Sequence, residues 1–362
     1  MNFFRYIAIA AVIAACQPDT GRNQSEATAD QGLNEPAGSS ETVRVQPVFI
    51  TEPAPYDTDD PAIWIHPEDP SQSLVLGTDK GGDTDQGGLY VYTLDGQIDH
   101  ERSVVGLDRP NNVDVAYGFT LGSETIDIAV VTVRRENAIR IFSLPDMAPV
   151  DNGGIPVFEG EEMRDPMGIG LYTDPQSGRI YAVVGRKDGP ADGTYLWQYE
   201  LSDSGEGYVT GSPVRKLGNY SGLKEIEAIA VDNEAGYIYY SDEMFGVRKY
   251  YAHPDSSTGE LNLFGRERFV RDHEGISIYK NPDAPGTGYV IVSDQQGQRF
   301  QLYRREGNNE FVKTVHVEAL ESDGNEITHI PLNDRFPRGL FVAMSDDKTF
   351  HFYSAAEIVG ND

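Results

Sequence analysis

Short apolar segments recur along most of the chain, and their first residues lie about 50 to 58 positions apart. The six segments begin at Leu74, Ile126, Arg179, Tyr237, Tyr289 and Leu340. Val, Ile, Tyr and Phe dominate them, and turn-forming residues are frequent between them, which is typical of short β-strands. None shows the spacing of an amphipathic helix. The pattern therefore predicts an all-β protein built from six similar units.

Each of these segments has an apolar companion strand on either side. In the first unit, residues 60–67 (DPAIWIHP) precede the central segment and residues 88–94 (GLYVYTL) follow it. In the last unit, residues 328–334 (THIPLND) are the predicted preceding strand. Three or four antiparallel strands, repeated six times at this period, predict a six-bladed β-propeller. A large β-sandwich is the alternative, but it accounts less well for six units of one pattern.

The repeat also predicts which side chains meet at one end of the propeller. The first strand of each unit lines the channel and the second is antiparallel to it, so the start of the first and the end of the second share a face. The second strands end in cations in the first three units and in acids in the last three: Lys80, Arg134, Arg135, Arg186 and Lys187, then Asp242, Glu243, Asp294, Asp346 and Asp347. The first strands begin mostly with acids and amides: Asp59, Asp60, Asn111, Asn112, Asp114, Glu227, Asp272 and Glu274, with Thr328 and His329 in the last unit.

Carboxylates that converge at a channel mouth repel one another unless cations neutralise them. Oxygen ligands without His or Cys favour hard ions, and a flexible multi-oxygen shell suits Ca²⁺ better than Mg²⁺. Cationic side chains beside bound calcium favour phosphate, and a metal-activated water could then attack phosphorus. The alternative interpretation is that these acids are solvated turn residues.

Composition narrows the range of partners. The chain has 58 acidic residues against 29 Lys and Arg, a formal charge of −29, which argues against nucleic acid and against anionic lipid as a partner. A single Cys excludes a disulfide framework, and seven scattered His without an HExxH motif argue against a zinc enzyme. We expect a small phosphorylated molecule as the partner, with several Ca²⁺ ions as cofactors, and a monomeric protein.

The N-terminal segment predicts export. Residues 1–15 contain an apolar run too short to span a bilayer, typical of a signal peptide, and the sequence ending at Cys16 resembles the lipobox of bacterial lipoproteins. Residues 16–46 are poor in large apolar side chains and predict a flexible tether. Residues 47–362 form the predicted catalytic propeller. We expect an outer-membrane lipoprotein, or a periplasmic or extracellular protein, that contacts a membrane only through a lipid anchor.

Several motifs resemble the β-propeller phytases: DDPAIW (59–64), NNVD (111–114), EAIAVDNEAGYIYYSDE (227–243) and RDHEG (271–275). The resemblance covers about residues 45–358. It implies a six-bladed, calcium-dependent phosphatase that removes phosphates stepwise from calcium-bound myo-inositol hexakisphosphate, with one phosphate site for cleavage and a neighbouring one for affinity. Two positions depart from the family pattern: Met167 stands where a Tyr is usual, and His329 where a second Asp is expected.

Matched motif by motif, the resemblance implies three sets of residues. The predicted catalytic residues are Asp59, Glu227, Glu243 and Asp272, with Glu243 as candidate proton donor. The predicted phosphate-binding cations are Lys80, Arg134 and Lys187. The predicted calcium ligands are Asp59, Asp60, Asn112, Asp114, Glu227, Glu243, Asp272, Glu274 and Asp323.

Two other functions remain open from the sequence. One is a six-bladed calcium lactonase-like hydrolase, against which the three cations count. The other is a non-enzymatic surface-binding propeller with structural calcium.

Overall fold

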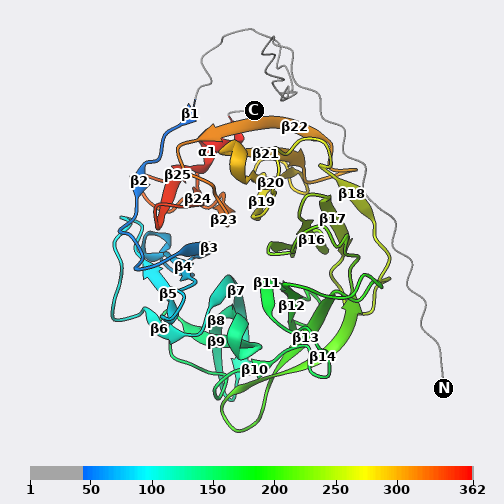
Figure 1. Cartoon of the computed structure of the whole chain (residues 1–362). Coiled ribbons are helices and arrows are strands. Elements are labelled where there is room, and N and C mark those ends of the chain that lie inside the picture. Colours follow the sequence, from blue (N-terminus) through cyan, green and yellow to red (C-terminus); the bar gives the residue numbers. More distant parts are fainter. Residues whose placement is uncertain (1–43, 361–362) are drawn as a thin grey trace, which may run out of the picture. The chain divides into compact units, whose positions relative to one another are not determined.

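The computed structural model describes residues 44–360. Their strands form six sheets arranged as a ring around a central channel (Figure 1), which confirms the predicted six-bladed β-propeller. The predicted signal peptide, Cys16 and most of the predicted tether lie outside the described residues. Arg44 and Val45, at the end of that tether, already pair with a strand of the propeller. In residues 44–360 no helix has the length and apolar character needed to cross a bilayer.

Blades 1 to 3 each contain four strands, which follow one another from the channel outwards. Blade 1 has β3 (Thr58–Trp64), β4 (Leu74–Asp79), β5 (Gly87–Tyr92) and β6 (Val104–Leu107). Blade 2 has β7 (Pro110–Leu121), β8 (Glu124–Val133), β9 (Ala138–Leu144) and β10 (Ile155–Pro156). Blade 3 has β11 (Pro166–Thr173), β12 (Ile180–Arg186), β13 (Leu196–Asp203) and β14 (Val209–Leu217).

Blades 4 to 6 repeat this order. Blade 4 has β15 (Ile229–Asp232), β16 (Tyr237–Asp242), β17 (Gly246–Tyr251) and β18 (Asn262–Phe264). Blade 5 has β19 (Ile276–Lys280), β20 (Gly288–Asp294), β21 (Arg299–Arg304), β22 (Phe311–Val317) and, outermost, β1 (Arg44–Val45). Blade 6 has β23 (Asn325–Thr328), β24 (Leu340–Ser345), β25 (Thr349–Ser354) and β2 (Phe49–Ile50). Three 3₁₀ turns (Pro70–Gln72, Arg134–Glu136 and Gln295–Gly297) and helix α1 (Ala355–Val359) complete the described elements.

Strand β2 closes the ring. It pairs antiparallel with β25, with Phe49 opposite Phe352 and Ile50 opposite His351. The blade that ends the chain thus takes its outermost strand from the beginning of the propeller. The propeller is thereby stabilised by hydrogen bonds between residues about 300 positions apart, a pairing that local sequence patterns do not reveal.

The first strand of blade 6 differs from the sequence prediction. The innermost strand is β23, which ends at Thr328, so the predicted strand 328–334 is wrong. Pro331 lacks an N–H for a sheet ladder, and Leu332 is instead buried in the apolar layer between blades 6 and 1. His329 lies beyond the end of β23, beside the Tyr279 ring at 6.4 Å. It therefore follows the innermost strand instead of beginning it.

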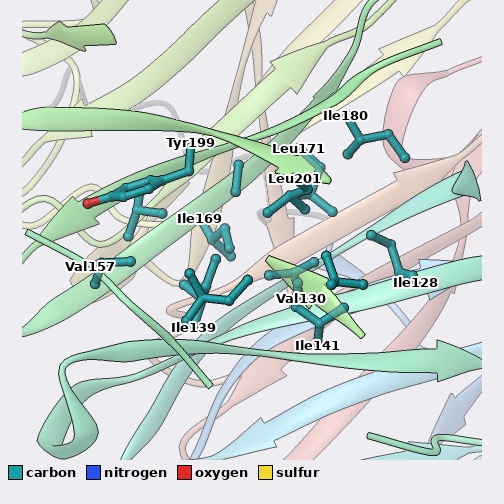
Figure 2. Close-up of a cluster of buried hydrophobic side chains, with 14 of the residues drawn as sticks. Ile128, Val130, Ile139, Ile141, Val157, Ile169, Leu171, Ile180, Tyr199 and Leu201 are labelled. Atoms are coloured by element: carbon teal, nitrogen blue, oxygen red, sulfur yellow. The ribbon is translucent and has the colours of Figure 1, made fainter. Parts of the chain in front are cut away.

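An apolar layer fills each interface between neighbouring blades, giving six buried clusters around the ring. Figure 2 shows the layer between blades 2 and 3, where Ile128, Val130, Ile139 and Ile141 face Ile169, Leu171, Ile180, Tyr199 and Leu201. Fully burying one such aliphatic side chain contributes about 1.5–3 kcal/mol. These layers fix the angle between the blades and thereby position the chain segments at the channel mouth.

Candidate active site

Hydroxyl groups near the ends of the second strands hold the segments that enter the next blade. The Thr132 hydroxyl, in β8, donates to the Met167 carbonyl at 2.6 Å. The Ser241 hydroxyl, in β16, donates to the His273 carbonyl at 2.7 Å. The same position in β20, Ser293, donates its hydroxyl to the Ser322 carbonyl, just before β23. Each contact fixes a segment that leads into the first strand of the following blade, so the acids on these segments are held by the blade before them.

Two glycines allow the acid-bearing segments of blades 5, 6 and 1 to touch. The Gly275 N–H donates to the Asp323 carbonyl at 2.8 Å, and a Cβ atom at Gly275 would lie 2.3 Å from that oxygen. The Gly324 N–H donates to the Asp59 carbonyl at 3.0 Å, and a Cβ there would lie 2.4 Å from Asp60 Oδ1. The Asp323 carbonyl lies too close to Gly275 for any side chain at that position. This close contact explains why the RDHEG motif ends in glycine.

Lys80 links the acids of blades 1 and 6. Its Nζ lies 3.4 Å from Asp59 Oδ1 and 3.3 Å from Asp323 Oδ2. Burial disfavours the ammonium, but these carboxylates outweigh it and hold the pKa of Lys80 well above its usual value. Asn111 donates to Asp59 at 2.9 Å, and Gln295 donates to Asp323 at 2.6 Å. Both carboxylates are thus oriented by a neutral donor as well as by a cation.

Three carboxyl groups, two of them buried and that of Glu227 half-buried, form the centre of the site. One oxygen each of Glu227, Glu243 and Glu274 lies within 4.8 Å of the other two. Burial, followed by the charge of neighbouring acids, raises the pKa of Glu227 and Glu274 well above the usual range. Burial also raises the pKa of Glu243, to about 8. Such a group of acids costs free energy to ionise unless positive charge is supplied. We call Glu227, Glu243, Asp272 and Glu274 the acidic cluster.

Lys224 also belongs to this site, and no sequence pattern pointed to it. Its Nζ lies 2.6 Å from Glu243 Oε2, 3.1 Å from Asp272 Oδ2 and 3.3 Å from Glu274 Oε1. Three other oxygens have no hydrogen-bond partner within residues 44–360, although their residues are buried: Glu243 Oε1, Asp272 Oδ1 and Glu274 Oε2. Buried carboxylate oxygens without donors are the ligands that a hard cation prefers.

The cations at the other side of the channel mouth differ in their exposure and in their contacts. Arg134 Nη2 lies 3.6 Å from Glu227 Oε1 and also contacts the Met167 sulfur. The Nε of Arg134 is buried without a hydrogen-bond partner in the described structure. Lys187 pairs with Glu225 at 2.9 Å, and its side chain is 46% exposed. We call Lys80, Arg134 and Lys187 the basic arc.

Two other predicted cations do not join this arc. Arg186 is buried, lies over the Phe158 ring at 4.5 Å and donates to the carbonyl oxygens of Thr194 and Tyr195. Arg135 pairs with Asp108 at the surface. A strand-end Arg thus serves either the fold or the site, and the strand pattern alone does not distinguish them.

Two of the strand-end aspartates, Asp242 and Asp294, are likewise structural, whereas Asp346 and Asp347 are exposed. Asp242 is buried against Arg248 at 2.8 Å and accepts the Ser221 N–H at 2.9 Å. Asp294 is buried against Arg299 at 2.7 Å and accepts the Val270 N–H at 2.9 Å. Both therefore hold the loops that carry the site and do not face the channel mouth as the strand pattern predicted. The neighbouring Glu243 is the strand-end acid that enters the cluster.

Three acids lie deeper, in a channel cavity of about 290 Å³: Asp60, Asp114 and Glu326. Asp60 accepts a backbone N–H from β7 at 3.1 Å, and Asp114 accepts one from β11 at 2.7 Å. Burial raises the pKa of Asp114 to about 6 and that of Glu326 to about 8. Asn112 is buried, and its Oδ1 has no hydrogen-bond partner among residues 44–360. The structure therefore places the predicted ligands Asp60 and Asp114 in the channel, apart from the three clustered glutamates.

Comparison with known proteins identifies the family. The family model described as Phytase matches residues 24–355. Over 304 residues the chain is 31% identical to the 3-phytase of Bacillus subtilis (strain 168), which covers 80% of this chain and 74% of that protein. Among solved structures, the WD40 β-propeller domain of Doa1 matches 88% of this chain and 99% of its own, with 9% identity and a TM-score of 0.47. The chain therefore belongs to the phytase family and is a phosphomonoester hydrolase.

Proposed function

We propose that this phytase is calcium-dependent and releases inorganic phosphate stepwise from calcium-bound myo-inositol hexakisphosphate. The observation that carries the proposal is the contact between the acidic cluster and the basic arc, made by Arg134 and Glu227 at 3.6 Å. A site with both signs of charge can hold divalent cations on one side and phosphate oxygens on the other. A purely structural calcium site would not require the buried, partner-free Arg134 Nε beside it.

The donor set fits calcium. All its groups are oxygens, and Glu243 Oε1, Asp272 Oδ1 and Glu274 Oε2 accept no hydrogen bond from residues 44–360. Glu227, Glu243, Asp272 and Glu274 would hold the cations, with Asp59 of blade 1 and Asp323 of blade 6 beside them. Bound calcium would supply charge neutralisation and a more acidic water.

The chain's own cations would orient the substrate. Arg134 presents its guanidinium to the phosphate to be cleaved, since a planar fork of N–H donors matches phosphate oxygens. Lys80 approaches the same group from blade 1. Lys187 is the most exposed of the three and is placed for a neighbouring phosphate of a polyphosphorylated ring.

The position of Glu243 favours cation binding over the proton donation expected from the sequence. An acid that binds a cation is ionised, and the Lys224 ammonium at 2.6 Å favours the same form. We therefore assign Glu243 to the ligands, which leaves solvent water as the source of the proton for the leaving alkoxide.

The test is an assay of phosphate release from calcium phytate, with and without a chelator, and a parallel assay on a lactone. We expect release that stops on chelation and returns with calcium, and no lactone cleavage. Lactone cleavage without phosphate release would instead support the lactonase alternative. Failure to cleave either substrate at any calcium concentration would leave the binding-propeller alternative and contradict our proposal.

We further propose that the mature chain is exported and anchored through lipidated Cys16, on the basis of the apolar run that precedes this residue. Metabolic labelling with a palmitate analogue should mark the wild-type protein and not the Cys16→Ser variant. Equal labelling of both would contradict the anchor.

A further inference from the structure

Lys224 places a fixed positive charge inside the acidic cluster. Its Nζ contacts one oxygen each of Glu243, Asp272 and Glu274, at 2.6, 3.1 and 3.3 Å. Its side chain is 30% exposed, whereas those of its three partners are 7% exposed or less. In a surface ion pair the partners are exposed to water, whereas here one ammonium contacts three buried carboxyl groups and offsets at most one of their charges.

The contacts divide each carboxylate in two. Lys224 engages Glu243 Oε2, Asp272 Oδ2 and Glu274 Oε1. The opposite oxygen of each residue, Oε1, Oδ1 and Oε2 respectively, has no hydrogen-bond partner within residues 44–360. Asp272 Oδ1 has only a long contact, 3.9 Å, with the exposed Arg271 Nε. One set of oxygens is therefore already occupied by a cation of the chain, and the other set is available to a cation from solution.

The backbone holds Lys224 in this position. The Tyr220 hydroxyl donates to the Lys224 carbonyl, and Ser221 is fixed by its N–H and hydroxyl, which donate to buried Asp242 at 2.9 and 2.7 Å. This segment is therefore tied to the end of β16, the strand that leads directly to Glu243. Lys224 and Glu243 are therefore both anchored at the end of β16, one through Ser221 and the other through the chain after Asp242. This shared anchor holds the two side chains in contact.

We propose that Lys224 acts as a built-in substitute for one divalent cation, so that this chain binds one ion fewer at the acidic cluster and keeps the cluster assembled when calcium is scarce. Lys224 is thus a positioning residue for the ligands, not a group that touches the reacting atoms. The inference rests on the proposed calcium dependence.

The experiment counts bound ions. Calcium titration by calorimetry, repeated with luminescent Tb³⁺, would compare wild type with Lys224→Met, Lys224→Arg and the control Lys216→Met. Lys216 loses the same charge but lies on β14 over the Trp197 ring, where it pairs with Glu161. We expect one additional ion per chain for Lys224→Met, and wild-type stoichiometry for the other two variants.

Thermal denaturation gives a second readout. Without calcium, Lys224→Met should unfold several degrees below wild type, because three buried carboxylates lose their cation, and calcium should restore most of the difference. A variant that folds only in calcium would support the proposal equally. Unchanged ion stoichiometry together with an unchanged calcium-free Tm would overturn it. If wild type itself binds no calcium, the proposed function fails instead, so the two failures are distinguishable.

Discussion

Replacing Glu227 by Gln should change stability in opposite directions with and without calcium. The substitution removes one negative charge from the three clustered glutamates and keeps the side-chain shape. The pKa of Glu227 is raised, so the folded state binds its proton more tightly than the unfolded state does. At pH values above the pKa of folded Glu227, its ionised carboxylate destabilises the folded state. Below pH 4.5, the usual pKa of a glutamate, the side chain is protonated in both states and this cost is absent. In a chelator at mildly alkaline pH, the Gln variant should be the more stable protein.

The size of this effect follows from the distances. Two unit charges at 4.8 Å, the outer limit of the separations in this cluster, repel by about 3.5 kcal/mol at an effective dielectric constant of about 20, and Glu227 has two such neighbours, Glu243 and Glu274. Arg134 at 3.6 Å returns about 4.6 kcal/mol of attraction on the same scale. These three contacts leave about 2 kcal/mol in favour of the variant, and the charges of Asp59 and Lys80 act on Glu227 in opposite directions. For a domain of this size we expect a Tm increase of a few degrees.

The assay is thermal denaturation of wild type, Glu227→Gln and a control, Glu206→Gln, in chelator and in saturating calcium. Glu206 lies on a surface turn, where its carboxylate accepts from the Tyr208 hydroxyl, so its loss should change neither condition. In calcium the order should reverse, because the variant lacks one ligand, and phosphate release should fall to background. A Glu227→Gln variant that is less stable than wild type in chelator would show that repulsion within the cluster is not the dominant effect. The same order of Tm values in chelator and in calcium would contradict the proposed role of Glu227 as a ligand.

Three other variants or conditions test other parts of the site. Arg134→Met should lower kcat/KM for phytate by about 10²–10³-fold, because a buried donor to the phosphate is lost, while circular dichroism stays unchanged. Chelation should lower the Tm of wild type more at pH 8 than at pH 6, because the raised pKa values of the clustered acids mean that they ionise, and repel, mainly at the higher pH. Glu326→Gln should reduce the loss of stability between pH 5 and 8 in chelator, by an amount on the order of 3 kcal/mol, because burial raises the pKa of this channel acid to about 8.

Each of these three predictions would be contradicted by a specific result. Undiminished kcat/KM in Arg134→Met would remove the guanidinium from the phosphate site. A chelator effect that is larger at pH 6 would mean that the acids are already paired within the protein. Parallel pH–stability curves for wild type and Glu326→Gln would show that the channel acid is solvated.

The sequence could predict the repeat and the meeting of opposite charges, since both follow from strand spacing and direction. Lys80 and Glu227 do lie at one end of the channel, close enough for the charge of each to shift the pKa of the other. The strand pattern could not show that Glu243 enters the acidic cluster whereas its neighbour Asp242 holds a loop through Arg248 and Ser221. That distinction depends on which way each side chain points after the strand ends.

Features that depend on contacts between distant segments were beyond prediction. Lys224 sits in a loop without a motif, and only its support from Tyr220 and Ser221 places it among the acids. Closure of the ring by β2 depends on pairing with β25 at the other end of the propeller. In the last blade, the alternation of Ile330 and Leu332 resembles a β-strand in the sequence, but Pro331 cannot donate a hydrogen bond to a neighbouring strand and β23 ends at Thr328. The catalytic and ligand roles of the individual residues stay predictions.

The central claim is that this channel mouth holds divalent cations between protein and phosphate. Anomalous diffraction from a crystal soaked with calcium and an unreactive phosphate mimic tests it most directly. We predict anomalous peaks within coordination distance of Glu227, Glu243 and Glu274, with the mimic bridging these ions and Arg134. Phosphate density elsewhere, or no anomalous signal at these three carboxylates, would contradict the account.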